Sequence, residues 1–181
     1  MRFPARRPRR LRRSPLLRGM VQETHVSAAD LIAPLFVKEG IDKPIPITSM
    51  PGQVQHTLAS VIDACGELAE LGVPAVILFG IPNEKDGQGT QAFADDGIVQ
   101  RALAALRAEY GDRLVLIADL CLCEYTDHGH CGIVRGGSID NDATLEVYAK
   151  TAVSQAKAGA DLIGPSGMMD GQVAAIRRAL D

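Results

Sequence analysis

The sequence predicts an α/β protein built on a parallel sheet. Short apolar runs typical of buried strands alternate along the chain with longer segments of helical periodicity. The 181 residues are the size of one ordinary domain. Apolar residues make up 46% of the chain and charged residues 23%, as in a globular protein. With no Trp and only 4% aromatic residues, the core is expected to consist of Ala, Val, Ile and Leu.

The expected elements begin with a buried strand over residues 31–37. A helix over residues 57–71 follows, in which apolar residues recur at three- and four-residue spacing until Gly72 ends it. The same alternation then predicts a strand over 75–79, a helix over 96–110, a strand over 114–118, a helix over 142–158, a strand over 161–164 and a helix from about 170 to 181. Gly111 supplies a helix end and Asp142 an N-cap.

The length of these units leaves two architectures open. The strand starts lie roughly 43 residues apart, so four strand–helix units fill the chain. One architecture is a complete open sheet of four strands. The other is the first half of a closed barrel of eight units, which needs about 250 residues. In both, the loops after the carboxyl ends of the strands carry the functional site.

Charge is distributed unevenly along the chain. Eight arginines precede the first acidic residue, Glu23, whereas residues 23–181 hold 11 basic and 22 acidic residues. A basic arm of this kind is typical of a nucleic-acid tail, a transit peptide or an arm that docks on an acidic surface of another copy. Phe3 is its only aromatic residue, which disfavours base stacking, and its three prolines disfavour an amphipathic helix. We therefore expect the docking arm and no nucleic-acid partner.

The sequence offers no membrane or secretory segment. No apolar run approaches the roughly 18 residues of a membrane span. The apolar pair Leu16 and Leu17 is followed at once by Arg18, so the apolar core of a signal peptide is missing. Four cysteines in such a chain favour thiols or metal ligands over disulfides. We expect a cytoplasmic protein without a membrane partner.

Three cysteines after the third strand indicate a metal site. Cys121 and Cys123 are two residues apart at a strand end, so their side chains point to the same side. Cys131 can return to them through a turn that Gly129 and Gly132 permit. Three thiolates suit Zn²⁺ in a tetrahedral site, and the fourth position stays open for water or substrate, as in a catalytic zinc centre.

The alternative for each cysteine is a place in the core, since free Cys is among the most buried residues. Cys65 fits that alternative because it lies on the apolar face of its predicted helix. His130 is a further candidate ligand, although its neighbour Cys131 is the better one. We expect His128 and His130 to line the loop behind the ligands or facing the substrate.

The cysteines belong to a longer signature, which consists of an acidic residue, Cys-x-Cys, an aromatic residue and Gly-His-Cys-Gly. The residues that form it are Asp119, Cys121, Cys123, Tyr125, Gly129, His130, Cys131 and Gly132. In this signature the chain resembles the porphobilinogen synthase (5-aminolevulinate dehydratase) family, in its zinc-dependent class. Further stretches of the chain agree with that family: 7–12, 34–37, 50–52, 140–144 and 169–173, together with Arg18 and Met20. One departure is Gly167 after Ser166, where the family usually has an Asp.

The resemblance implies a fold and an assembly. Family members are (β/α)₈ TIM barrels, so residues 26–181 would form a partial barrel domain of about the first four βα units. Residues 1–25 would be the basic oligomerisation arm, which in the family wraps a neighbouring barrel and supports a homo-octamer. That role agrees with a basic arm meeting an acidic body.

The resemblance also implies the chemistry. The family condenses two 5-aminolevulinate molecules to porphobilinogen with loss of two waters, in tetrapyrrole and heme biosynthesis. Cys121, Cys123 and Cys131 would hold Zn²⁺, while Asp119 and Ser166 would contact substrate. The two lysines that form Schiff bases, and the acids that bind Mg²⁺, would lie beyond residue 181, so no catalytic residue is assigned in this chain. The chain alone is then expected to be inactive. The alternative is a complete small zinc-binding module without synthase activity.

Overall fold

Strands and helices alternate along the chain as the sequence predicts. The computed structural model describes residues 7–181. Its main elements are β1 (Ile32–Lys38), α2 (Leu58–Glu70), β4 (Ala75–Ile81), α3 (Ile98–Tyr110), β5 (Val115–Leu120), α4 (Asn141–Lys157), β8 (Leu162–Pro165) and α5 (Gln172–Leu180). Each begins and ends within a residue or two of its expected range, which confirms the α/β assignment.

The sheet is open and holds two strands that the sequence did not predict. Its order is β2-β3-β1-β4-β5-β8, with β2 (Ile45–Pro46) antiparallel to β3 (Val54–His56) and all other neighbours parallel. β3 pairs with the second half of β1, where Phe36 lies opposite Gln55. The sheet therefore has six strands, two more than the four that the sequence predicts. Among residues 7–181 the sheet does not close into a barrel.

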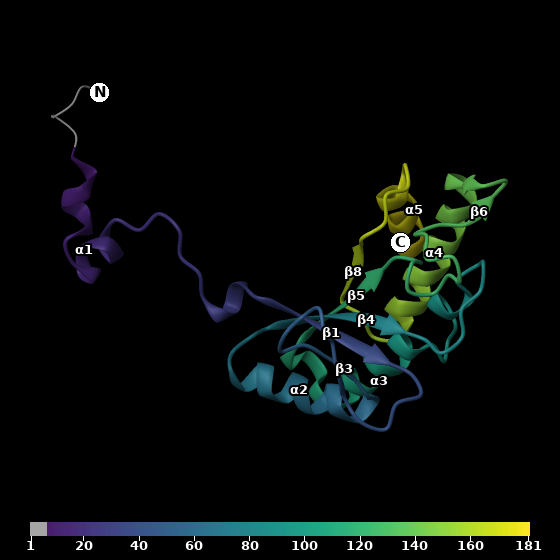
Figure 1. The fold of residues 1–181 in the computed structure, drawn as a ribbon, viewed down its shortest axis with the longest axis horizontal. Coiled ribbons are helices and arrows are strands. Elements are labelled where there is room, and N and C mark those ends of the chain that lie inside the picture. The colour runs from purple at the N-terminus through teal and green to yellow at the C-terminus, as the bar shows by residue number, and fades with distance from the viewer. Residues whose placement is uncertain (1–6) are drawn as a thin grey trace.

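The helices lie in chain order on one face of the sheet (Figure 1). α2 packs against α3, α3 against α4 and α4 against α5. The core beneath them takes alternate strand residues, as the two-residue period of a strand requires, together with helix residues: Leu35, Val37, Val76, Leu78, Leu116, Ala118, Val61, Leu103 and Leu106. Phe36 and Phe79 lie opposite each other in register, and their half-buried rings stack at 5.2 Å between centroids.

Short elements fill the connections. A two-stranded hairpin of β6 (Val134–Arg135) and β7 (Ser138–Ile139) precedes α4. Single 3-10 turns, η3 (Thr90–Ala92) and η4 (Gly111–Arg113), flank α3. These elements span two or three residues each, so they leave no periodic signal in the sequence.

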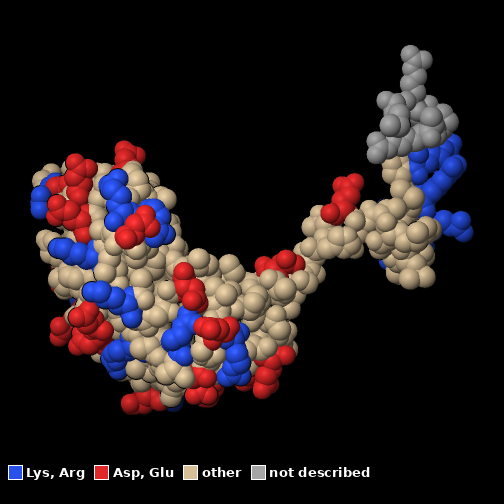
Figure 2. All heavy atoms as spheres, turned by 180° about the vertical axis from the view of Figure 1, so that it is seen from behind, with Lys and Arg blue, Asp and Glu red and all other residues tan. Residues whose placement is uncertain are grey.

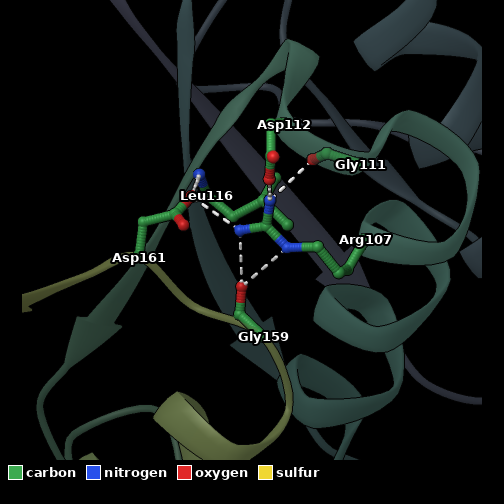
Figure 3. Close-up of polar contacts among 6 residues, drawn as sticks. All are labelled: Arg107, Gly111, Asp112, Leu116, Gly159 and Asp161. Atoms are coloured by element: carbon green, nitrogen blue, oxygen red, sulfur yellow. Dashed lines mark hydrogen bonds and ion pairs between the residues drawn. The ribbon is translucent and has the colours of Figure 1, made fainter.

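A polar cluster ties the amino ends of β5 and β8 to α3 (Figure 3). Arg107 Nη2 lies 2.7 Å from Asp161 Oδ2 and 2.8 Å from the Gly159 carbonyl oxygen, and Arg107 Nη1 donates to the Gly111 carbonyl oxygen at 2.6 Å. Asp161 also accepts the Leu116 N–H at 2.8 Å. The loops that carry the predicted site lie at the opposite, carboxyl ends of these strands.

The arm projects away from the sheet (Figure 1) and contains short helices rather than an extended chain. They are η1 (Pro8–Arg12) and α1 (Pro15–Met20), and a further 3-10 turn, η2 (Ala28–Asp30), follows the arm before β1. The prolines disfavour a long amphipathic helix, but one of them begins the short helix α1. Pro15 occupies the first turn, where its missing N–H costs nothing, and the Ser14 hydroxyl accepts the Leu17 N–H at 3.2 Å.

Basic side chains gather on the arm, whereas acidic and basic side chains are mixed over the visible face of the body (Figure 2). The predictions made for Arg2, Phe3, Pro4 and Arg6 fall outside the described residues. Within residues 7–181, no helix combines the length and apolar character that crossing a membrane requires.

Candidate metal centre

The three predicted cysteines converge at the carboxyl end of β5. Cys121 directly follows the strand, and a turn returns Cys131 to it. The three Sγ atoms lie within 4.8 Å of one another, and those of Cys121 and Cys123 are 3.4 Å apart. Cys65 is fully buried in the core under α2, as expected, and takes no part in this cluster.

The sulfur geometry fits a tetrahedral zinc ion. Zn–S bonds of about 2.3 Å place the sulfurs of a tetrahedral site about 3.8 Å apart. The Cys121–Cys123 separation of 3.4 Å and the 4.8 Å limit on the whole cluster are compatible with that value. Three ligands would leave the fourth position open.

Two of the three thiols, those of Cys123 and Cys131, favour the protonated form when no cation is present. Burial is the main cause that raises the pKa of Cys123 and of Cys131. Glu124 adds to it, since Cys123 Sγ donates to Glu124 Oε2 at 3.1 Å. A metal ion that binds here must displace these protons, so its affinity is expected to rise with pH.

The cysteine turn is fixed by glycines and by threonine hydroxyls. Gly129 has a φ of +72°, a conformation that side chains other than glycine rarely adopt. Gly132 is needed for space instead, because a Cβ there would lie 2.7 Å from Thr144 Oγ1. Thr144 Oγ1 accepts the Ile133 N–H at 2.9 Å, and Thr126 donates to the His130 carbonyl oxygen at 2.8 Å. The predicted turn is therefore built by both glycines, each for a different reason.

A neighbouring loop, which sequence reasoning missed, supports the cysteine turn. The Asp86 backbone donates to the Tyr125 carbonyl oxygen at 3.3 Å and accepts the Asp127 N–H at 3.2 Å. The Asp86 carboxylate accepts the N–H groups of Gln88 and Thr90 at 2.8 and 3.1 Å. The sequence Asp-Gly-Gln-Gly-Thr over 86–90 suggests an Asp-stabilised turn, but not its partner.

The two histidines of the motif lie outside the sulfur cluster. Both are exposed, with ring centroids 5.4 Å apart, and His128 Nδ1 accepts the His130 N–H at 3.1 Å. Neither belongs to the group of side chains close enough to share one ion with the cysteines. Both lie on the exposed loop, and their predicted place behind the ligands or facing the substrate stays a prediction.

Asp119 and Ser166 meet beside the cysteines, at the ends of the paired strands β5 and β8. Asp119 is 7% exposed, and this burial raises its pKa to about 6, although a hydrogen bond with the Ser166 side chain acts in the opposite direction. The Ser166 N–H donates to the Leu120 carbonyl oxygen at 3.2 Å. Gln155 Nε2 donates to the Asp119 carbonyl oxygen at 2.8 Å. The structure thus brings Asp119 and Ser166 together at the strand ends that carry the cysteine cluster, and their contact with substrate stays a prediction.

Tyr148 of α4 is a further residue that the sequence did not single out. It is fully buried, and its hydroxyl donates to the Cys131 carbonyl oxygen at 2.8 Å. Burial raises its pKa well above the ordinary tyrosine value, so the hydroxyl keeps its proton and remains a donor. On sequence alone it reads as an ordinary core residue of an amphipathic helix.

Comparisons with known proteins identify relatives of the chain. The family model for delta-aminolevulinic acid dehydratase matches residues 5–181. The Streptomyces coelicolor protein of that name is 55% identical over 182 residues, covering 99% of this chain and 55% of the relative. The Bacillus subtilis protein is 54% identical, covering 97% of this chain and 54% of the relative. The chain therefore spans about half the length of these relatives.

A solved structure supports the same assignment. The Toxoplasma gondii delta-aminolevulinic acid dehydratase (porphobilinogen synthase), crystallised with the reaction product porphobilinogen, superposes with a TM-score of 0.93 at 39% identity. The superposition covers 97% of this chain and 51% of that structure. From the family match, the identities and the shared fold together, the chain belongs to the delta-aminolevulinic acid dehydratase family.

Proposed function

We propose that this chain carries the metal centre and part of the substrate site of a porphobilinogen synthase, which joins two 5-aminolevulinate molecules and releases two waters. The single observation that carries the proposal is the cluster of three cysteine sulfurs within 4.8 Å beside the Asp119–Ser166 pair. The product porphobilinogen in the Toxoplasma structure supports the reaction. In fold terms, β1, β4, β5 and β8 would be the first four strands of an eight-stranded barrel.

Zn²⁺ is the metal that the donor set favours, because three sulfur ligands suit a borderline-soft ion and not Mg²⁺. Cys121, Cys123 and Cys131 would hold it. Bound there, Zn²⁺ would supply a Lewis acid with one open position. Asp119, with a pKa of about 6, can exchange a proton near neutral pH, and Ser166 can orient that carboxyl group.

The covalent step would need groups from outside these residues. The five lysines of the chain are Lys38, Lys43, Lys85, Lys150 and Lys157, and we assign none of them to a Schiff base. The family's Schiff-base lysines and Mg²⁺ acids would lie beyond residue 181. Without a Schiff base the carbonyl is not activated, so we expect these 181 residues alone to form no porphobilinogen.

The arm would serve assembly. Leu16 and Met20 of the arm are 82% and 83% exposed, and Val26 directly after it is 72% exposed, an unusual exposure for apolar side chains. Arginines lie close to Leu16 and Met20 in the sequence. Both features suit docking on an acidic copy of the same protein, as in a homo-octamer. The four cysteines are free, which fits a reducing, cytoplasmic setting.

Zinc titration of the purified chain tests the proposal. We expect one tightly bound Zn²⁺ per chain and none in the Cys121→Ala/Cys123→Ala/Cys131→Ala variant. The matched control Cys65→Ala should keep full stoichiometry, because its thiol lies in the core. Unchanged zinc binding in the triple variant would refute the ligand assignment.

The activity test uses the same preparations with 5-aminolevulinate and borohydride. We expect no reduced adduct on any lysine of the chain, and no porphobilinogen. A stoichiometric adduct on Lys38, the lysine at the end of β1, would contradict the placement of the covalent chemistry outside these residues.

A further inference from the structure

Tyr148 connects two of the predicted metal ligands, Cys121 and Cys131, to helix α4. Its hydroxyl donates to the Cys131 carbonyl oxygen at 2.8 Å and lies within hydrogen-bonding reach of the Cys121 side chain. Its ring is fully buried in the cluster formed by α4, α5 and the residues after β5. The side chain is thus held on a rigid helix while its polar end contacts the cysteine loop.

Gly167 lies directly against the same hydroxyl. A Cβ built on Gly167 would lie 2.0 Å from the Tyr148 hydroxyl oxygen, 2.7 Å from Cζ and 2.9 Å from Cε2. Its φ is not positive, so the backbone conformation alone would admit other residues. Glycine is therefore required for space. Tyr148 fills the volume that a side chain at this position would occupy.

We propose that Tyr148 is a positioning residue for the metal centre, and that Gly167 is glycine because it must leave room for the Tyr148 hydroxyl. The inference rests on the proposed metal site. It makes position 167, beside the substrate residue Ser166, a determinant of metal affinity that acts through Tyr148.

The reason is the way in which the cysteine turn is held. Cys131 is half-exposed and follows the exposed residues 127–130, so its backbone has few other restraints. Among them are the Thr126 bond to the His130 carbonyl oxygen and the Ile133 N–H bond to Thr144. Removing the Tyr148 donor would free the carbonyl of the ligand itself. Losing a hydrogen bond that orients a metal ligand typically weakens metal binding by about 10- to 100-fold.

The test compares two tyrosine–glycine pairs with the same arrangement, in which a tyrosine hydroxyl donates to a backbone carbonyl and lies against a glycine. Tyr110 also donates its hydroxyl to a backbone carbonyl, that of Ile62 at 2.6 Å, and a Cβ on Gly66 would lie 2.9 Å from that hydroxyl. This second pair joins α3 to α2, away from the cysteines. Variants of the full chain are Tyr148→Phe and Gly167→Ala, with Tyr110→Phe and Gly66→Ala as matched controls. The readouts are the Zn²⁺ dissociation constant by chelator competition and the thiolate-to-Co²⁺ charge-transfer band.

We expect Tyr148→Phe and Gly167→Ala each to weaken Zn²⁺ binding about 10-fold or more and to shift the Co²⁺ band. The Tyr110 and Gly66 controls should lower the melting temperature and leave both metal readouts unchanged. In the double variant Tyr148→Leu/Gly167→Ala, the alanine should cost no additional affinity beyond Tyr148→Leu, because the clash is gone.

Three results would overturn the inference. They are unchanged affinity and Co²⁺ spectrum in Tyr148→Phe, equal losses in the Tyr110→Phe control, and a double variant in which the two losses multiply. Absence of Zn²⁺ binding by the unmodified chain would instead refute the proposed metal site itself. Melting curves for every variant separate a loss of folding from a loss of metal affinity.

Discussion

Arg107 Nη2 and Asp161 Oδ2 lie 2.7 Å apart at the amino end of the sheet, and this one pair joins three elements of the fold (Figure 3). Arg107 comes from α3, Asp161 precedes β8, and Asp161 also accepts the Leu116 N–H from β5. The guanidinium additionally donates to two backbone carbonyl oxygens, those of Gly111 and Gly159. The planar fork of Arg suits this set of acceptors, and a lysine ammonium would not reach them together.

We predict that Arg107→Ala lowers the free energy of unfolding by about 1–3 kcal/mol, because several carbonyl acceptors lose their donor. Arg107→Lys should lose most of the same stability. Urea denaturation measures both. The control is Arg177→Ala, whose ion pair with Asp181 is largely exposed and should be worth less than about 1 kcal/mol. Equal effects of the two alanine variants would contradict this prediction.

The Asp161 carboxylate should make stability depend on pH. Partial burial alone would raise its pKa, but the Leu116 N–H and Arg107 outweigh burial and lower it below the ordinary aspartate value. A lowered pKa in the folded state contributes stability above the unfolded value of about 3.9 and loses it as the pH falls through the folded pKa.

The native chain should therefore have a higher free energy of unfolding than Asp161→Asn. The difference should be complete at pH 7 and smaller at pH 3. Urea unfolding at the two pH values measures it. Asp112→Asn is the control, since that side chain is fully exposed 3.6 Å from the same arginine and should matter little at either pH. An advantage of the native chain that grew as the pH fell would show that the sign is wrong.

Cys65 should be chemically inert while the chain is folded. Burial raises the pKa of this thiol to about 12, so almost no thiolate forms at pH 8. Burial also raises the pKa of Cys131, but that thiol is partly exposed whereas Cys65 is fully buried. We predict that iodoacetamide at pH 8 modifies Cys131 slowly in the metal-free chain and leaves Cys65 unmodified, as peptide mass mapping would report. Denaturant should remove the difference. Modification of both at similar rates in the folded chain would place Cys65 outside the core.

Asp86→Ala should loosen the cysteine turn from a distance. The variant removes three acceptor contacts, from the N–H groups of Gln88 and Thr90 and from the Thr90 hydroxyl. We expect a loss of about 1–2 kcal/mol in unfolding free energy and faster hydrogen exchange at the Asp127 amide, which donates to the Asp86 carbonyl. Asp86→Asn keeps one acceptor oxygen and should have a smaller effect. Unchanged hydrogen exchange at the Asp127 amide in the alanine variant would contradict the prediction, because it would show that the loop around Asp86 does not restrain the cysteine turn.

The sequence was sufficient for the repeated part of the fold. Each strand and helix from β1 to α5 has enough residues for its apolar period to be visible, and glycines such as Gly72 and Gly111 mark the helix ends. The cysteine cluster was also predictable, because its members lie within eleven residues and local turn chemistry brings them together.

What the sequence could not predict depends on contacts between distant residues or on very short elements. β2 and β3 are too short to be periodic, and α1 begins at a proline that is unfavourable inside a helix and favourable at its start. The contact of Asp86 with the cysteine turn joins residues about 40 positions apart. The Tyr148 hydroxyl occupies the space that a side chain at position 167 would need, and residue types alone do not reveal this contact.

The 2.0 Å approach between a Cβ at position 167 and the Tyr148 hydroxyl also constrains how such a site can evolve. A larger residue at 167 is harmful while tyrosine stands at 148, and it becomes acceptable once 148 is smaller. A substitution at position 148 in helix α4 must therefore be fixed before a substitution at position 167 in the loop after β8. Lineages that retain tyrosine should remain confined to glycine, so the pair is expected to change together or not at all across relatives of this chain.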